Sequence, residues 1–307
     1  MPLLIDGVQL AAKPESANAF LKQFPKFKES SAVLTSQAPL VVGPEGLLYV
    51  GQREYGGTSP DDSVIRVIGS EDATTCHIGV LRHTGSGAVC LLHFDGCNTQ
   101  QGVGSMVQVV KELSQGKAPG RLELHLVGGF DDERHNSDEV SLEIFGCLVQ
   151  WQDDIHLVTA CIGKHNTTFK RNIPFPIIYG LAVEVQSGKI FSATFPDHGP
   201  DIPARSARHF TGSHDNLPVY DHHRKQMVIG PFTYRQLGNL DQILGMPDRF
   251  YRQRLSTSPA QEPASFEQSV RTCLQFMKEH PEPMKTFFPG GKPHYFKKEP
   301  DGRWTLL

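Results

Sequence analysis

The chain has 307 residues, of which 38% are hydrophobic and 21% charged, and its formal net charge at pH 7 is −3. This composition is typical of a globular protein, and we expect one domain over residues 1–307. Binding to nucleic acid or to an anionic membrane would require a clustered basic excess, which is absent from the sequence. No apolar run approaches the ~20 residues of a membrane-spanning helix, and the N-terminus lacks the features of a secretory signal.

The six cysteines are scattered without a Cys-x-x-Cys pair, and several lie within apolar strand or helix patterns. We therefore expect reduced thiols and a cytoplasmic protein that can also enter the nucleus. We also expect a monomer. We predict no zinc site in the stretch that is richest in Cys and His, because its spacing matches no compact ligand pattern and its residues would alternate between two strand faces. Those residues are Cys76, His77, His83, Cys90 and His93.

The first part of the chain predicts one helix followed by strands. The predicted elements are a helix at 17–24 and strands at 39–42, 47–50 and 64–68. A Gly-Pro-Glu-Gly turn is expected to join the first two strands. Pro2 follows the initiator methionine, and we expect the mature chain to begin with this proline.

Residues 69–96 read GSEDATTCHIGVLRHTGSGAVCLLHFDG and are the centre of the functional prediction. Apolar residues recur at spacing two on either side of a Gly-Ser-Gly break, which predicts a β-hairpin. If residues 84–87 form the loop, His93 lies opposite Ile78 and on the same face as Cys76, roughly 7 Å along the strand. A register shifted by one residue would place Cys76 and His93 on opposite faces.

Cys76 and His93 have the chemistry of a nucleophile and a base. A cysteine reacts as its thiolate, and a nearby imidazole can lower the thiol pKa and then protonate the leaving group. Ser70 lies six residues before Cys76, so on an extended strand the two share a face and the hydroxyl can orient the imidazole. Spacing alone leaves a second interpretation open, in which a buried apolar cysteine and a structural histidine have no catalytic role.

The motif SEDATTCH, with a histidine 17 residues after the cysteine, closely resembles the protein N-terminal asparagine amidohydrolases. Other segments agree with that family, so the resemblance spans nearly the whole chain: MPLL, GPEGLLYV, RLELHLVGGFDD, QDDIHLVT and STSPAQEP. More distantly, the spacing is similar to that of chemotaxis-receptor deamidases and of deamidating cytotoxic necrotizing toxins. One departure is Glu71, which stands where the family motif has an aspartate.

The resemblance implies a cysteine hydrolase on an α+β fold, an α-β-β sandwich with mixed sheets and helices on one face. The triad of the family falls on Cys76, His93 and Ser70. Ser59 and the threonines beside Cys76, Thr74 and Thr75, compete with Ser70 for the third role.

After the hairpin, helices and strands alternate. The predicted elements are helices at 103–113 and from Asn136 onward, and strands at 122–127 and 155–162. The first of these strands ends at Gly128-Gly129, where the backbone can approach a neighbour or ligand closely. Asn136 with Glu139 predicts an N-cap and a capping box. This order implies helices on one face of a mixed sheet that includes the hairpin.

From residue 176 the pattern predicts strands, at 177–185, 190–194 and 227–229, and hence a second β layer. Residues 197–221 are expected to be irregular. Asp221-His222-His223 has the residue types of a metal site, but adjacent loop histidines are more often solvated, and we predict no metal there.

Residues 256–263 are expected to be a linker. Residues 264–307 predict a helix capped by Ser265 with Gln268 and a final hairpin around Pro300-Asp301-Gly302.

The predicted reaction is hydrolysis of the side-chain amide of an N-terminal asparagine, which yields N-terminal aspartate and ammonia without a cofactor. The free α-ammonium of the substrate requires a carboxylate partner, and Asp72 is the first candidate. The alternatives are Glu71, Glu54 and Asp95. The other predicted substrate contacts are Thr75, Gly129 and Pro2.

Two other functions stay open. The distant deamidases suggest an enzyme that acts on glutamine or asparagine within a folded partner. A non-catalytic adaptor could bind peptide N-termini through the same pocket. The family resemblance points to substrates with a free N-terminal asparagine and to the pathway that degrades proteins according to their N-terminal residue.

Overall fold

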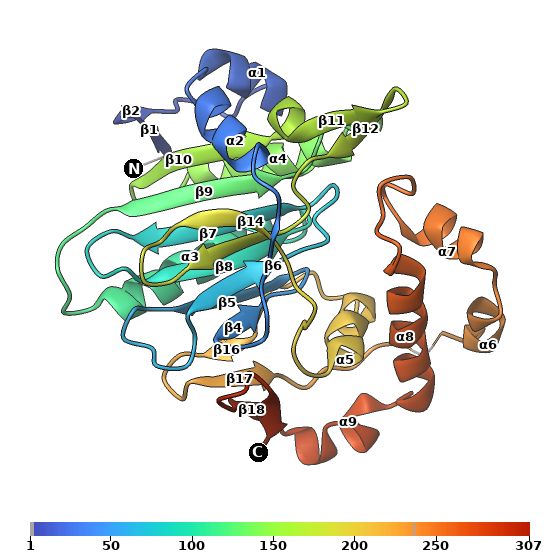
Figure 1. Ribbon diagram of the computed structural model, residues 1–307. Helices are drawn as coiled ribbons and strands as arrows, with labels where there is room; N and C mark the ends of the chain where they lie inside the picture. Colours follow the sequence, from blue (N-terminus) through green and yellow to red (C-terminus); the bar gives the residue numbers. More distant parts are fainter. Residues whose placement is uncertain (1–2, 236) are drawn as a thin grey trace.

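The computed structural model describes residues 3–235 and 237–307 of the chain. A large mixed sheet has helices on one face and a second sheet on the other (Figure 1). The predicted α+β class and α-β-β sandwich are therefore confirmed. Pro2, a predicted substrate contact, lies outside the described residues. Among the described helices, none has both the length and the apolarity that a membrane span requires.

The large sheet contains the predicted hairpin, with strand order β15-β5-β8-β7-β9-β10-β1-β2. The bounds are β1 Leu3–Ile5, β2 Val8–Gln9, β5 Glu54–Thr58, β7 His77–His83, β8 Val89–Phe94, β9 Leu122–Gly128, β10 Ile155–Ile162 and β15 Leu217–Pro218. Strand β7 is antiparallel to both β8 and β9, whereas β9 and β10 are parallel. A helix connects β9 to β10, as a parallel connection requires.

Helices cover one face of this sheet and bury its apolar residues. They are α1 Ala17–Gln23, α3 Thr99–Ser114 and α4 Asn136–Val149, whereas α2 Phe27–Thr35 packs on β10 at the side of the second sheet, where Leu34 joins the core between the sheets. Because side chains alternate along a strand, Leu81, Cys90 and Leu92 face these helices, while Ile78 and Leu91 face the second sheet. The residue His93 shares the parity of Leu91, so it points between the two sheets.

The second sheet has the strand order β3-β14-β13-β6-β4. The bounds are β3 Leu40–Val41, β4 Leu47–Tyr49, β6 Val67–Ser70, β13 Leu181–Glu184 and β14 Ile190–Thr194. The predicted strands at 39–42 and 47–50 and the turn between them are present, but the turn makes no hairpin, because β3 and β4 lie at opposite edges of this sheet. Each strand pairs in parallel with a partner from elsewhere in the chain, a contact that a local turn signal does not reveal.

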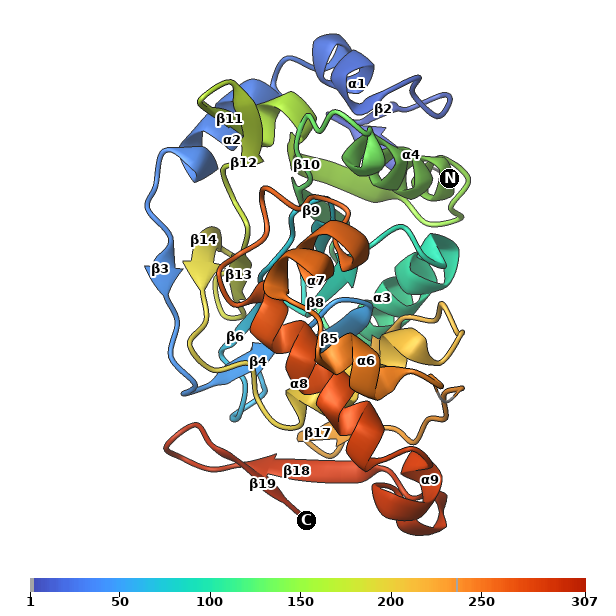
Figure 2. The same cartoon turned by 90° about the vertical axis from the view of Figure 1, so that its right-hand side faces the viewer.

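The remaining elements extend the sandwich at the C-terminal side, where α8 crosses in front of the strands in Figure 2. A further sheet has the order β16-β17-β18-β19, and β11 pairs with β12 in a separate hairpin. The bounds are β11 Thr167–Lys170, β12 Ile173–Pro176, β16 Tyr220–Asp221, β17 Gln226–Ile229, β18 His294–Lys298, β19 Trp304–Leu306, α5 Ile202–Ala207, α6 Leu240–Leu244, α7 Asp248–Leu255, α8 Phe266–Glu279 and α9 Pro283–Thr286. The predicted final hairpin is confirmed, whereas residues 197–221, expected to be irregular, contain α5 and two short strands.

Two predicted helix caps differ from the structure. Asn136 is the first residue of α4 rather than its cap, and His135 occupies the cap position in a left-handed conformation. The carboxylate of Asp132 accepts hydrogen bonds from the N–H groups of Asn136 and Ser137. An acceptor four residues upstream therefore satisfies the helix start. Ser265 does precede α8, but its side chain makes no capping hydrogen bond.

Candidate functional site

The register of the central hairpin decides whether Cys76 and His93 can meet. Ile78 is paired with His93, and His77 is paired with Phe94. Cys76 immediately precedes β7, so it extends the face that carries His93. Of the two registers that the sequence left open, the structure has the one with the loop at residues 84–87. His77 points to the opposite face, where its Nε2 lies 2.8 Å from Ser141 Oγ of α4, so it does not compete with His93 for the thiol.

Ser70 lies at the end of β6 in the second sheet, and its hydroxyl reaches across the core to His93. The Oγ atom is 2.8 Å from Nδ1 of His93, and both side chains are buried. Because Nδ1 of His93 is hydrogen-bonded to Ser70, Nε2 is the ring nitrogen that can exchange a proton with the Cys76 thiol. Thr74 and Ser59, the competing hydroxyls, are also buried, but neither has a hydrogen bond to His93 among the described residues.

The local geometry behind the Ser70 prediction was wrong. Residues 71–76 are not an extended strand. Asp72 has a left-handed backbone (φ 62°), and its carbonyl accepts a hydrogen bond from the N–H of Thr74. The chain thus turns between the two sheets at this point, and the sandwich, rather than strand periodicity, brings Ser70 to His93.

The resting pair is neutral at physiological pH. Burial lowers the pKa of His93 to about 4, an effect that the nearby carboxylate of Asp95 only partly opposes. Burial, followed by the charges of Asp95 and Glu262, raises the pKa of the Cys76 thiol, even though part of the residue remains exposed. At rest the Cys76 thiol therefore keeps its proton and the His93 ring is neutral, so the site holds no preformed thiolate–imidazolium pair.

The backbone around Cys76 is held from β9. The N–H of Gly129 donates to the carbonyl of Cys76 at 2.8 Å. A Cβ at Gly128 would lie 2.5 Å from that carbonyl, and one at Gly129 would lie 2.6 Å from the His77 ring. Both glycines also have positive φ angles, so neither position accepts a side chain. Gly129, predicted as a substrate contact, thus holds the backbone of Cys76 in place through this hydrogen bond.

The backbone N–H groups of Thr75 and Cys76 have no hydrogen-bond acceptor among the described residues. Both belong to the turn that carries the thiol. The Thr75 hydroxyl, in contrast, lies 3.0 Å from the hydroxyl of Thr257 and joins this turn to a distant segment. Two unpaired donors beside a thiol are the arrangement that stabilises an oxyanion.

Three of the four carboxylates predicted for the α-ammonium have other partners. The carboxylate of Glu71 accepts hydrogen bonds from His198 and from the Phe195 N–H. That of Glu54 is buried with Arg205 and Arg208, which outweigh burial and hold its pKa at about 2. Asp95 accepts from Gln52, Arg53 and the N–H of Cys97, and its pKa is lowered although burial alone would raise it.

Asp72 is the exception, because its carboxylate accepts no hydrogen bond among the described residues. The residue is open to solvent, yet surrounding protein removes enough water to raise its pKa to about 6, and the charge of Glu71 adds to this effect. Glu262 also has a raised pKa, through burial and the charge of Asp72. Glu262 thus lies near both Asp72 and Cys76, and Asp72 belongs to the turn that leads into Cys76.

Residues 256–263, which we expected to be a linker, pack beside this site. Thr257 contacts Thr75, and Glu262 accepts a hydrogen bond from Ser256. The side chain of Gln261 donates to the carbonyl of Pro174 on β12 at 2.7 Å. The segment therefore joins the turn before Cys76 to the β11–β12 hairpin.

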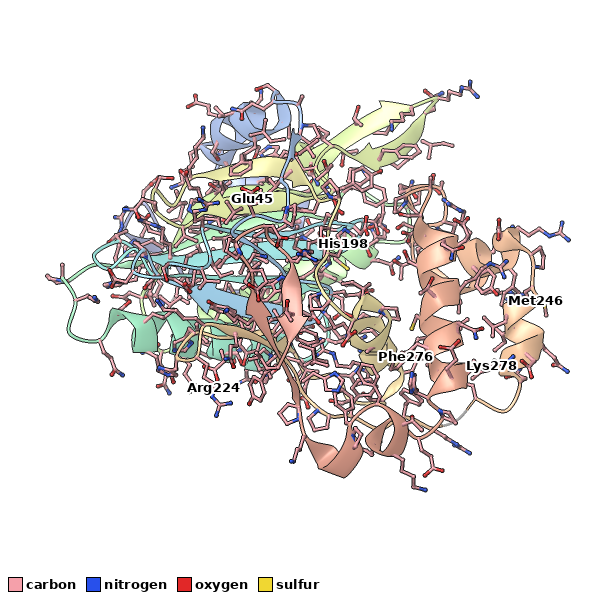
Figure 3. The ribbon with its side chains drawn as sticks, turned by 60° about the horizontal axis from the view of Figure 1, so that its bottom comes forward. Glu45, His198, Arg224, Met246, Phe276 and Lys278 are labelled. Carbon is pink, nitrogen blue, oxygen red and sulfur yellow. The ribbon has the colours of Figure 1, made fainter. Side chains whose placement is uncertain are left out.

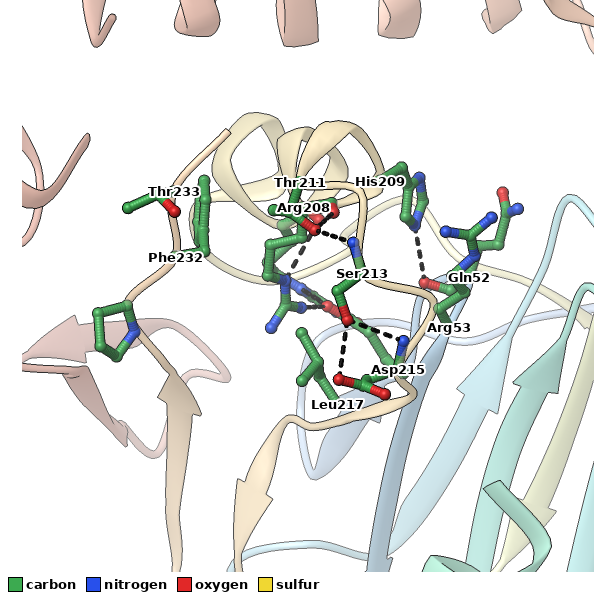
Figure 4. Close-up of a pocket in the computed structure, with 13 residues that line it drawn as sticks. Gln52, Arg53, Arg208, His209, Thr211, Ser213, Asp215, Leu217, Phe232 and Thr233 are labelled. Atoms are coloured by element: carbon green, nitrogen blue, oxygen red, sulfur yellow. Dashed lines mark hydrogen bonds and ion pairs between the residues drawn. The ribbon is translucent and has the colours of Figure 1, made fainter. Parts of the chain in front are cut away.

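A pocket of about 300 Å³ adjoins the site on the side of β5 (Figure 4). Arg53 and His209 belong to its lining: the Arg53 guanidinium lies near Cys76, and the His209 ring, whose own pKa is lowered by burial, lies near His93. The Nη2 atom of Arg53 donates to Sγ of Cys97, and Nε2 of His209 lies 3.1 Å from the Gln52 carbonyl. The Glu54 carboxylate and its two arginines also belong to the pocket lining.

Comparison with known proteins gives consistent matches over nearly the whole chain. The profile of the protein N-terminal asparagine amidohydrolase family matches residues 37–306. Proteins of that name are 42% identical in Sus scrofa and 41% identical in Homo sapiens, each over 100% of this chain and 98% of the relative. A more distant one from Arabidopsis thaliana is 27% identical over 84% of this chain and 80% of its own length.

The chain belongs to this family. The resemblance inferred from the sequence is therefore confirmed, and with it the assignment of the chain as an amidohydrolase enzyme.

Within this amidohydrolase, sequence reasoning named the cysteine, the histidine and the serine, and the fold brings the last two into contact. It did not find Glu262, Arg53 or His209 in the surroundings of the site. A signal existed for Glu262, since it lies in the STSPAQEP segment that carries part of the family resemblance. For Arg53 and His209 we find no such signal, because their placement depends on how β5 and the residues after α5 pack against the hairpin.

Proposed function

We propose that this protein hydrolyses the side-chain amide of an N-terminal asparagine, with Cys76 as nucleophile, His93 as base and acid, and Ser70 as the residue that orients His93. One observation carries the proposal: Ser70 Oγ lies 2.8 Å from His93 Nδ1, and the hairpin register puts His93 on the face of Cys76. Ammonia release from a peptide with a free N-terminal asparagine, compared with the acetylated peptide, tests it.

The neutral resting pair indicates that proton transfer accompanies attack. As Sγ of Cys76 bonds to the carboxamide carbon, its proton moves to Nε2 of His93. The backbone N–H groups of Thr75 and Cys76 are the donors for the oxyanion that forms. His93 then protonates the nitrogen, and the C–N bond breaks to release ammonia and leave a thioester.

The second half of the reaction uses the same groups in reverse. Neutral His93 takes a proton from a water molecule, whose oxygen attacks the thioester carbonyl. Collapse of the tetrahedral intermediate breaks the C–S bond, and the proton on His93 returns to sulfur. The product is a peptide with N-terminal aspartate, and no step requires a metal or an organic cofactor.

The first prediction concerns the orienting role of Ser70. Ser70→Ala removes one buried hydrogen bond to His93, and such a loss costs about 1–3 kcal/mol, or roughly 5- to 150-fold in rate. We expect the loss in kcat, with KM little changed, because Ser70 does not contact substrate. Steady-state kinetics on an Asn-peptide measure it, and Ser70→Thr, which keeps a hydroxyl, should restore part of the rate. Wild-type kinetics for Ser70→Ala would move the third role to Ser59, Thr74 or Thr75.

Selectivity for a free N-terminus requires a group that binds the positively charged α-ammonium more tightly than an uncharged, acetylated terminus. Asp72 supports this role because its carboxylate has no hydrogen-bond donor among the described residues, and partial loss of water around it raises its pKa to about 6. Glu262 is the second acidic group near Cys76. An α-ammonium between these two carboxylates would gain strong charge-assisted hydrogen bonds, whereas an acetylated terminus would offer neither of them a cation.

The second prediction follows from the raised pKa of Asp72. Its ionised form, present above about pH 6, binds the α-ammonium, so kcat/KM should fall as the pH falls through about 6. A second fall is expected near pH 4, where His93 becomes protonated in the free enzyme. On the alkaline side, kcat/KM should fall above about pH 8 as the substrate amine loses its proton.

Asp72→Asn tests this assignment. It should raise KM and remove the limb near pH 6, so that the acid limb moves toward the His93 pKa of about 4. Asp61→Asn is the matched control, because Asp61 is a surface residue paired with Lys117 and should keep the wild-type profile. If Asp72→Asn retains both the KM and the limb near pH 6, Asp72 does not bind the amine, and the same test passes to Glu262→Gln.

We further propose a cellular role for the product. Hydrolysis exchanges a neutral terminal side chain for an acidic one, and the family resemblance implies that the resulting N-terminal aspartate marks proteins for degradation. We expect this reaction in the cytoplasm, and also in the nucleus, from a monomeric enzyme. Stabilisation of reporter proteins with an N-terminal asparagine in cells that contain only Cys76→Ser would be the supporting result.

A further inference from the structure

A cluster of metal-ligand side chains lies on a different part of the molecule from Cys76. The turn between β16 and β17 carries His222 and His223, and Glu112 approaches them from the last turns of α3. The ligand atoms of these three side chains all lie within 4.8 Å of one another, and Nε2 of His222 is 3.8 Å from a carboxylate oxygen of Glu112. Segments more than 100 residues apart in sequence thus converge on one point.

The two atoms that face each other in this cluster, His222 Nε2 and Glu112 Oε2, have no hydrogen-bond donor or acceptor among the described residues. Nε2 of His222 is buried and has no hydrogen-bond partner among the described residues, and the His222 side chain is only 12% exposed. In Glu112, Oε1 accepts a hydrogen bond from Gln108, whereas Oε2 is the oxygen that faces His222. A buried ring nitrogen without a partner is costly unless a ligand satisfies it.

Nearby cations are directed elsewhere. The Arg224 guanidinium lies over the Tyr295 ring and pairs with Asp221, and Nζ of Lys225 donates to Ser63. The carboxylate of Asp221 also accepts the N–H groups of His223 and Arg224, which holds the turn in place. The charges that face the cluster are therefore mainly those of carboxylates, which favour a bound cation.

We propose that Glu112, His222 and His223 bind one divalent transition-metal ion of the zinc class. Two imidazoles and one carboxylate suit such an ion, and a water molecule would complete a tetrahedral site. Metal bonds of about 2.0–2.2 Å place tetrahedral ligands about 3.4 Å apart. The 3.8 Å between His222 Nε2 and Glu112 Oε2 is close to this value, and the exposed side chain of His223 lies within 4.8 Å of both.

The bound metal would stabilise the fold by linking two distant segments and would take no part in hydrolysis. It joins α3, which packs on the helix-covered face, to the β16–β17 turn at the molecular edge. Figure 3 labels Arg224, two residues beyond His222, at that edge, whereas His198, which contacts Glu71 beside the hydrolytic site, lies near the centre. Metal binding to the folded chain should therefore raise the unfolding temperature.

The experiment measures binding of Zn²⁺ to the chelator-treated full chain by competition with a colorimetric chelator, and the unfolding temperature with and without Zn²⁺. We expect one site whose affinity falls at least about tenfold in Glu112→Gln and in His223→Ala. Both altered side chains are partly or fully exposed, so the fold should persist. His214→Ala, which removes an exposed histidine elsewhere, is the control and should bind as wild type does.

Free thiols are the competing ligands, and Co²⁺ distinguishes them. Cobalt bound by nitrogen and oxygen gives visible ligand-field bands without the intense near-ultraviolet charge-transfer band of a cobalt–thiolate bond. The proposal is overturned if no metal binds, if both variants bind as tightly as wild type, or if the cobalt spectrum is that of a thiolate site. Loss of binding in Glu112→Gln and His223→Ala together with unchanged ammonia release supports it.

Discussion

Replacing Cys76 with serine should reduce ammonia release from an N-terminal asparagine peptide at least about 1000-fold, to near the background rate, because no other group can form the covalent intermediate. A serine hydroxyl is a far weaker nucleophile at neutral pH, and His93, whose pKa is about 4, is a weak base for it. The exchange of one sulfur for oxygen at a partly exposed position should leave the fold intact. Circular dichroism and the unfolding temperature check this.

His93→Ala should lose nearly as much activity as Cys76→Ser, and the double variant should lose no more than either, since groups that act as a unit are not additive. Cys147→Ser is the matched control. It removes a partly exposed thiol from α4 and should retain wild-type turnover. Turnover of Cys76→Ser within about tenfold of wild type would exclude Cys76 as the nucleophile.

The central hairpin could be predicted because its information is local. Spacing-two apolar residues define both strands, and the loop at 84–87 fixes which residues face each other. The register of Ile78 with His93 follows from that loop, and the sheet environment leaves it unchanged. Long strands and helices with a clear apolar period, such as β10, were predicted for the same reason.

Contacts between layers could not be predicted from periodicity. Ser70 was correctly expected near His93, but the expected reason, one extended strand from Ser70 to Cys76, was wrong. The serine ends a strand of the other sheet, and the chain turns at Asp72. Glu262 reaches the site only because residues 256–263 fold back onto the turn before Cys76. The β11–β12 hairpin was missed because Pro174 and Pro176 argue against strands, a penalty that a separate two-stranded hairpin tolerates.

The length of the substrate side chain should determine whether an N-terminal amide is hydrolysed. A site that fixes the α-ammonium at Asp72 and the carbonyl at the N–H groups of Thr75 and Cys76 sets one distance between them. Glutamine is longer by one methylene, so its carbonyl would overshoot the oxyanion donors. A methylene misfit in binding discriminates about 10- to 200-fold, and a displacement of ~1 Å at the reacting carbon costs roughly another 100-fold. Gln-peptides should therefore be at least about 1000-fold slower than matched Asn-peptides.

Blocking the amine should have a still larger effect, because acetylation removes the cation and leaves the Asp72 carboxylate without its charged partner. The decisive measurement is ammonia release from four peptides at equal concentration: free N-terminal Asn, free N-terminal Gln, acetylated Asn and internal Asn. We predict turnover of the first, turnover slower by at least about 1000-fold for the second, and none for the other two. Comparable rates on glutamine or on internal asparagine would contradict recognition of the α-amine and favour an enzyme that deamidates folded partners.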